Sequence, residues 1–177
     1  MRDSLQQPTP PEQSHTVPSR VAVAKHPVHP MLVVFPIAFL GSVLVTDLAH
    51  LWRGGTFWAQ ASFWLSAAGL IGGVLAGLVG TVDLLLIREV RRHVSAWNHM
   101  IAAVMVLALA AASVWLRWPD PAAAVWPWGL LLSAMLALLV AVAGWLGGTL
   151  SFRHGVGVYG EYDPEADDGD DDVPPAE

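Results

Sequence analysis

The chain has 177 residues, of which 54% are hydrophobic and only 14% are charged, and its mean hydropathy is +0.50. These values exclude an ordinary water-soluble domain. The absence of cysteine excludes disulfides, thiolate-ligated iron–sulfur clusters, thioether-attached haem and cysteine nucleophiles within this chain. The net charge of −6 is misleading, because residues 161–177 carry nine acidic and no basic side chains and residues 1–160 have a net charge of +3.

The first 24 residues contain four prolines with Gln, Ser and Thr and little that could be buried, so they predict a disordered N-terminal arm. The arm lacks the short apolar core and cleavage site of a secretory signal, and we expect no cleavage. Two His-Pro pairs follow within the segment from His26 to Pro36. Because a residue before proline is disfavoured in the helical region, we predict that a helix begins at Pro30 and that His26 and His29 lie just outside it.

Four apolar stretches are long enough to cross a hydrocarbon core of about 30 Å, at residues 30–51, 57–87, 97–117 and 125–150. They predict an all-α integral membrane protein. Its expected form is an antiparallel four-helix transmembrane bundle over residues 25–160, with disordered termini at 1–24 and 161–177. An even number of spans places both termini on one side, which carries seven of the nine basic residues. The positive-inside rule makes this side cytoplasmic, in the bacterial cytoplasmic (inner) membrane.

A polar cluster is expected at the opposite end of the bundle. Asp47 follows His29 by 18 residues, which is about 27 Å along a helix, and Arg117 follows His99 by the same number. Asp47 and Arg117 should therefore reach a similar depth and form an ion pair or share a polar network. With His50, one turn beyond Asp47, they make up a predicted structural polar cluster.

The second span is rich in small residues at four-residue spacing, which predicts the central packing helix of the bundle. At its cytoplasmic end stands Asp83, and an acidic residue so close to hydrocarbon usually has a partner. Folding brings five histidines to the same end as this carboxylate: His26, His29, His93, His99 and His154. The separations from His29 to Asp83 (54) and from His99 to His154 (55) suggest two similar hairpins side by side.

Three interpretations of this end remain open. Axial ligands to haem b could come from His29, His99 and His154, with Asp83 supporting them, in a redox-linked electron-transfer subunit. The same four residues, with Asp83 as a direct ligand, could instead hold a divalent metal for binding or transport. In the third interpretation the protein is structural or anchors a partner without any cofactor, and Asp83 only accepts hydrogen bonds at a helix start.

Motifs of common enzymes are missing from the sequence. It contains no Gly-rich phosphate loop, GxSxG elbow or HExxH zinc motif, and no basic-aromatic nucleic-acid surface. We therefore expect no catalytic residues, no nucleic-acid partner and no enzyme activity of the chain by itself. The expected surroundings are the lipid bilayer, and the candidate partners are a redox protein, a quinone or a second copy of the chain.

Four pieces of the sequence resemble a bacterial membrane-protein family known as domain of unknown function 2231. They are HPVHPMLVVFPIAF at 26–39, GTVD at 80–83, His99 at the start of the third span, and GWLGGTLSFRHGVGV at 144–158. The resemblance covers about residues 25–160. Family members often carry Asn four residues after the third-span histidine, where this chain has Ala103, so no role of that amide carries over. The family has no assigned activity. Fusion of some relatives to Rieske-type or cytochrome c-type modules implies an electron-transfer setting.

Overall fold

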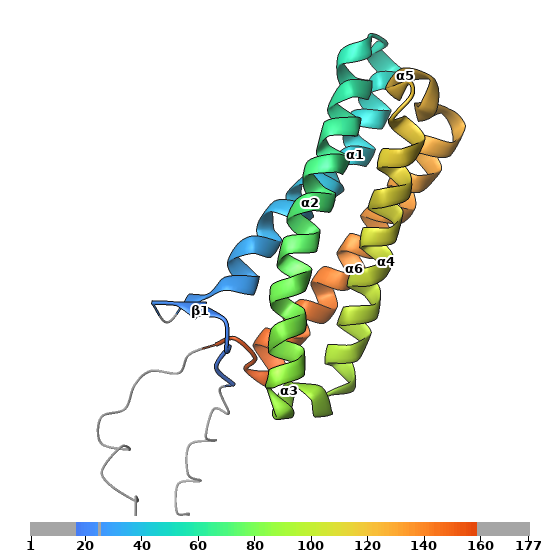
Figure 1. Ribbon diagram of the computed structural model, residues 1–177. Helices are drawn as coiled ribbons and strands as arrows, with labels where there is room; N and C mark the ends of the chain where they lie inside the picture. The colour runs from blue at the N-terminus through green and yellow to red at the C-terminus, as the bar shows by residue number, and fades with distance from the viewer. Residues whose placement is uncertain (1–16, 25, 159–177) are drawn as a thin grey trace, which may run out of the picture.

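A computed structural model describes residues 17–24 and 26–158 of the chain. Four helical stretches are long and apolar enough to cross a membrane: α1 (Val28–Arg53), α2 (Thr56–Leu86), α4 (Val94–Arg117) and the stretch Pro121–His154. The last consists of α5 (Pro121–Ala124), the irregular turn η1 (Val125–Gly129) and α6 (Leu130–His154). A five-residue helix, α3 (Arg88–Arg92), connects α2 to α4 (Figure 1). The predicted all-α membrane architecture is confirmed.

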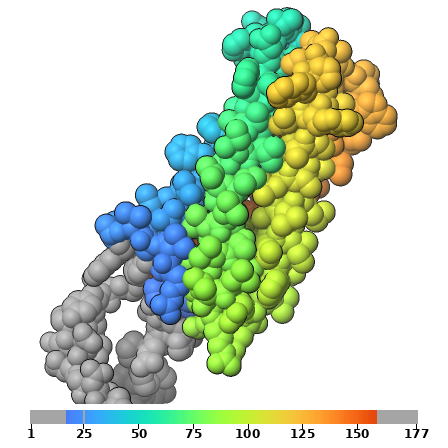
Figure 2. Space-filling view, in the orientation of Figure 1, coloured from blue at the N-terminus to red at the C-terminus, as the bar shows by residue number. Residues whose placement is uncertain are grey.

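The long helices are arranged as two pairs. Helix α1 packs most extensively on α2, and α4 packs on α6, while smaller contacts of α1 with α6 and of α2 with α4 close the ring. Figure 2 shows α2 and α4 side by side along one face. Within the first pair, Thr46 contacts Ser62 and Leu40 packs on Gly69, where an added Cβ would collide with it. Residues late in α1 therefore meet residues early in α2.

Helix α1 begins two residues earlier than predicted. Its N-cap is Pro27 in extended backbone, and His29 and Pro30 are its second and third residues. A proline in the first turn removes no helical hydrogen bond, because the first four N–H groups of a helix have no partner within it. The prediction that His29 lies outside the helix is therefore wrong. His26 does lie outside it, in the two-residue strand β2 (His26–Pro27) that pairs antiparallel with β1 (Ala22–Val23).

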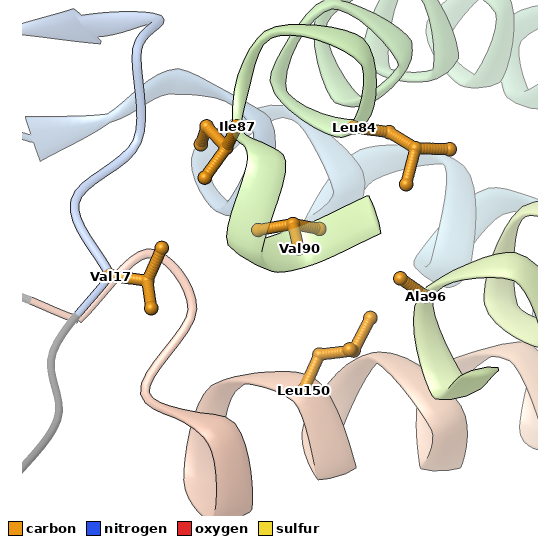
Figure 3. Close-up of a cluster of buried hydrophobic side chains, with 6 residues drawn as sticks. All are labelled: Val17, Leu84, Ile87, Val90, Ala96 and Leu150. Carbon is orange, nitrogen blue, oxygen red and sulfur yellow. The ribbon is translucent and has the colours of Figure 1, made fainter. Parts of the chain in front are cut away.

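The α3 end of the bundle has its own small core. Ile87 takes an extended conformation (φ −96°, ψ 105°), so α2 stops and α3 begins in a new direction. This turn brings Val90 of α3 into a cluster with side chains from α2, α4, α6 and the N-terminal segment: Val17, Leu84, Ile87, Ala96 and Leu150 (Figure 3). Residues 17–24, the N-terminal strap, are thereby fixed against the bundle. Residues 17–24 belong to the arm predicted to be disordered (1–24), but Val17 is packed in this cluster; the rest of that arm (1–16) and the tail 161–177 lie outside the described residues.

Candidate functional site

His29 projects from the first turn of α1 toward α2. Its Nδ1–H donates to the carbonyl oxygen of Ala76 over 2.8 Å. Because a carbonyl oxygen can only accept, this bond assigns the ring proton to Nδ1 and leaves the lone pair on Nε2. Gly80 provides the space for the ring, since a Cβ there would lie 2.8 Å from both Cε1 and Nδ1 of His29.

His99 has the same environment in the second helix pair. Its Nδ1–H donates to the carbonyl oxygen of Ala143 in α6 over 3.0 Å, which again leaves Nε2 with its lone pair. Gly147 faces this ring, and a Cβ at Gly147 would lie 3.1 Å from its Cε1. In both pairs, then, a histidine near the start of one helix is oriented by a carbonyl and a glycine of the other helix.

The two histidines meet between the helix pairs. Their ring centres are 6.3 Å apart and their planes are nearly perpendicular, at 84°. Both rings are half-buried. Of the four predicted ligands, His29 and His99 are the two whose rings the structure brings together.

Asp83 has different partners from those expected. Its carboxylate accepts hydrogen bonds from the hydroxyl of Ser19 (2.6 Å) and from the backbone N–H groups of Arg20 (2.9 Å) and Val21 (3.2 Å). The donors belong to the N-terminal strap and not to the start of a long helix. Asp83 therefore fastens the strap to the end of α2, while Val17 is bonded through its backbone to Gly155 and Gly157.

His154 is paired with His93 and not with His29. The ring centres of His154 and His93 are 4.3 Å apart, with an interplanar angle of 33°. Within residues 17–24 and 26–158, no group of three or more His, Cys, Asp and Glu side chains is arranged to hold a metal ion. His26 is exposed, and its Nδ1–H donates to the carbonyl oxygen of Ala24.

Two cavities flank the His29–His99 pair. The first, of about 310 Å³, is lined mainly by α2 and α4, and the second, of about 290 Å³, mainly by α1 and α6. They share eight residues, and the two histidines are among them. Exposed apolar side chains border both cavities, including Leu78 and Val104 at the first and Ile37 at the second. The histidines thus stand between two apolar spaces that reach the outer surface of the bundle.

The opposite end contains a buried polar network. Arg117 and Asp47 are fully buried, and Nη2 of Arg117 donates to Oδ2 of Asp47 and to the carbonyl oxygen of Gly129. Nη1 of Arg117 donates to the hydroxyl of Ser113. His50 is bonded to the carbonyl oxygen of Gly55. The network therefore consists of the ion pair, the hydroxyl of Ser113 and the carbonyl oxygen of Gly129, and the hydrogen bond of His50, a predicted member, lies outside it.

Sequence reasoning missed several of these contributors. The hydroxyl of Ser113 is hydrogen-bonded to that of Ser66, and the hydroxyl of Ser62 to that of Thr46. The three serines are fully buried. The sequence pattern that could have identified them is polar residues four positions apart within apolar helices. The carbonyl oxygens that orient the two histidines belong to the backbone, so no side chain in the sequence indicates them. The glycines opposite the rings were recognisable only as small residues.

These features define a multi-pass membrane protein that holds two oriented histidines between two helix pairs. A family model described as predicted membrane protein (DUF2231) matches residues 25–160. The chain therefore belongs to this family, as the sequence motifs suggested. None of the curated proteins and none of the solved structures matches the chain.

Proposed function

We propose that this chain is a redox-linked membrane subunit in which His29 and His99 would hold a b-type haem. The observation that carries the proposal is the equivalent setting of the two rings. Each Nδ1–H is bonded to a backbone carbonyl of the neighbouring helix, which leaves each Nε2 as the donor atom. Such a bond on the second ring nitrogen is the usual support of a metal-ligating histidine.

The separation of the rings is compatible with one iron between them. A metal bound to two imidazole nitrogens at about 2.0–2.1 Å separates these nitrogens by about 4 Å, and the ring radii bring the centres to about 6 Å. The observed distance between the ring centres is 6.3 Å. The cavities on either side are apolar; the first, about 310 Å³, lies at the lower end of the usual range for cofactor pockets of about 300–1,000 Å³, and the second, about 290 Å³, lies just below it.

When bound, haem would supply one-electron transfer. The residues of the chain would hold and orient it: Ala76 and Ala143 fix the tautomers, and Gly80 and Gly147 give the rings room. A quinone or a partner redox protein is the class of electron partner that this function requires. The excess of arginine at the α3 end supports a cytoplasmic location for both termini in a bacterial inner membrane.

The divalent-metal alternative has less support. Protein-bound zinc, for example, takes three or four side-chain ligands, and no group of three is arranged in this way in the described part of the chain. A haem iron needs only two ligands from the protein, because the macrocycle supplies the others. A purely structural role would not explain the pairing of the two histidines or the cavities beside them.

Visible absorption spectra of the purified protein test the proposal. We expect a Soret band that is lost or shifted in His29→Ala and in His99→Ala. His26→Ala is the matched control, because His26 is exposed and borders neither cavity. The proposal is wrong if the protein retains no haem after expression with added haem precursor. It is also wrong if His29→Ala and His99→Ala both keep the wild-type spectrum. Metal found by elemental analysis without a Soret band would favour the divalent-metal alternative.

A further inference from the structure

A basic surface lies at the α3 end, and none of its charged side chains lines either cavity beside the histidine pair. Its four arginines are exposed, three on α3 and one at the end of α6: Arg88, Arg91, Arg92 and Arg153. The rings of His93 and His154, with centres 4.3 Å apart and planes inclined at 33°, join the two segments. We call these four arginines and two histidines the basic collar.

Helix α3, which carries three of the collar arginines, is packed against the bundle. Val90, in the middle of α3, is only 5% exposed and belongs to the core cluster of Figure 3. The Nε1–H of Trp97 donates to the carbonyl oxygen of Arg91 over 3.0 Å and ties α3 to the first turn of α4. Because Val90 occupies the inner side of α3, the three arginines of this helix remain on the outside. α3 thus holds three arginines and one exposed glutamate, Glu89, and its net positive charge has a defined place on the bundle.

Two exposed apolar side chains are neighbours of collar residues in the sequence. Phe152, the neighbour of Arg153, is 91% exposed, and Val94, just after His93, is 72% exposed. Water would be unfavourable surroundings for side chains so fully exposed, whereas a bilayer provides hydrocarbon at the ends of membrane-crossing helices. The collar therefore adjoins exposed side chains that suit contact with hydrocarbon.

We propose that the basic collar binds the headgroups of anionic phospholipids. Guanidinium groups bind phosphate in a bidentate manner, and basic residues beside membrane-spanning helices attract anionic lipids. The chain's own acidic segment, residues 161–177, is a competing occupant by charge alone. The lipid fits better because Phe152 and Val94 next to the collar match acyl chains and not an acidic peptide. This proposal does not depend on whether the histidine site binds haem.

Lipid binding by the full-length protein in neutral detergent tests the proposal. The probes are dioctanoyl phosphatidylglycerol and, as the uncharged comparison, dioctanoyl phosphatidylcholine. We expect the wild-type protein to bind phosphatidylglycerol about tenfold more tightly than phosphatidylcholine, and this preference to decrease at high salt. The variant Arg91→Gln/Arg92→Gln/Arg153→Gln should lose the preference. Arg53→Gln, which neutralises an exposed arginine at the opposite end, should keep it.

Two outcomes would overturn the proposal. One is an unchanged preference for phosphatidylglycerol in the triple arginine variant, after circular dichroism has shown that it retains its helices. The other is the absence of any preference in the full-length protein. A chain that ends after Gly160 then distinguishes the reason: a preference that appears only in this shorter chain would identify residues 161–177 as the occupant of the collar.

Discussion

The buried pair of Asp47 and Arg117 gives a prediction whose magnitude follows from unequal hydrogen bonding. Arg117 has four acceptors: Asp47, the hydroxyl and the carbonyl oxygen of Ser113, and the carbonyl oxygen of Gly129. Asp47 has Arg117 as its one ion-pair partner; its Oδ1 has no partner among the described residues, and neither has the Nε–H of Arg117. Removing Arg117 therefore strands a buried carboxylate, whereas removing Asp47 leaves the guanidinium three of its acceptors.

We expect Arg117→Gln to lower the free energy of unfolding by about 3–5 kcal/mol, the usual cost of breaking a buried ion pair from one side. Asp47→Asn should cost less, about 1–3 kcal/mol, because the remaining bonds of Arg117 persist. In the double variant neither residue is left charged and buried. Its cost should therefore be smaller than the sum of the two single costs, by about 1–3 kcal/mol.

Unfolding of the detergent-solubilised protein by added sodium dodecyl sulfate, followed by the fluorescence of its nine tryptophans, measures these values. Arg53→Gln is the control, because this exposed arginine of the same end should change stability by less than about 0.5 kcal/mol. Additive effects of the two substitutions would refute the coupling. A larger cost for Asp47→Asn than for Arg117→Gln would refute the reasoning from unequal hydrogen bonding.

Two further predictions concern the surroundings of the histidine site. Gly80→Ala places a Cβ 2.8 Å from the His29 ring and should lower stability by about 1–3 kcal/mol in the same unfolding assay, whereas Gly77→Ala makes only an ordinary contact at 3.8 Å and should cost less than about 1 kcal/mol. Equal losses of stability in Gly80→Ala and Gly77→Ala would contradict the close packing of the His29 ring on Gly80. Asp83→Ala removes the acceptor of the N-terminal strap and should speed the reaction of Met100→Cys, which lines the first cavity, with a water-soluble maleimide. Asp83→Asn keeps an oxygen that can accept from the backbone N–H groups, so it should speed the reaction less. Identical reaction rates for Met100→Cys alone, with Asp83→Ala and with Asp83→Asn would contradict the inference that the strap covers this cavity.

The architecture follows from the sequence because membrane burial leaves little choice. A backbone in hydrocarbon must satisfy its own hydrogen bonds, so four long apolar stretches become four helices. The start of α1 was misjudged for a local reason. The preference against helix before proline is weak in the first turn, where the chain enters from Pro27 and no helical bond is lost at Pro30.

The histidine site was only partly predictable. Sequence patterns place His29, His99, His154 and Asp83 at one end, but they do not say which way each side chain turns. The direction depends on backbone carbonyls and on the packing of α3, whose bend at Ile87 carries His93 to His154. Asp83 turned to the strap because two consecutive N–H groups and a hydroxyl satisfy a carboxylate more fully than one imidazole would.

The equal spacings in the sequence acquire a common explanation in the structure. His29 and Asp47 stand 18 residues apart in α1, and His99 and Arg117 stand 18 residues apart in α4. Since the histidines meet at one end and the charged residues at the other, α1 and α4 correspond to each other across the bundle.

The partner helices correspond in the same way. Ala76 and Gly80 in α2 support His29 as Ala143 and Gly147 in α6 support His99, with the same four-residue step. The two helix pairs thus bring two like histidine rings together, with their centres 6.3 Å apart. Two unlike charges at the other end can instead neutralise each other. The buried ion pair therefore joins α1 to α4 at one end of the bundle, and the two histidine rings meet between the helix pairs at the other end.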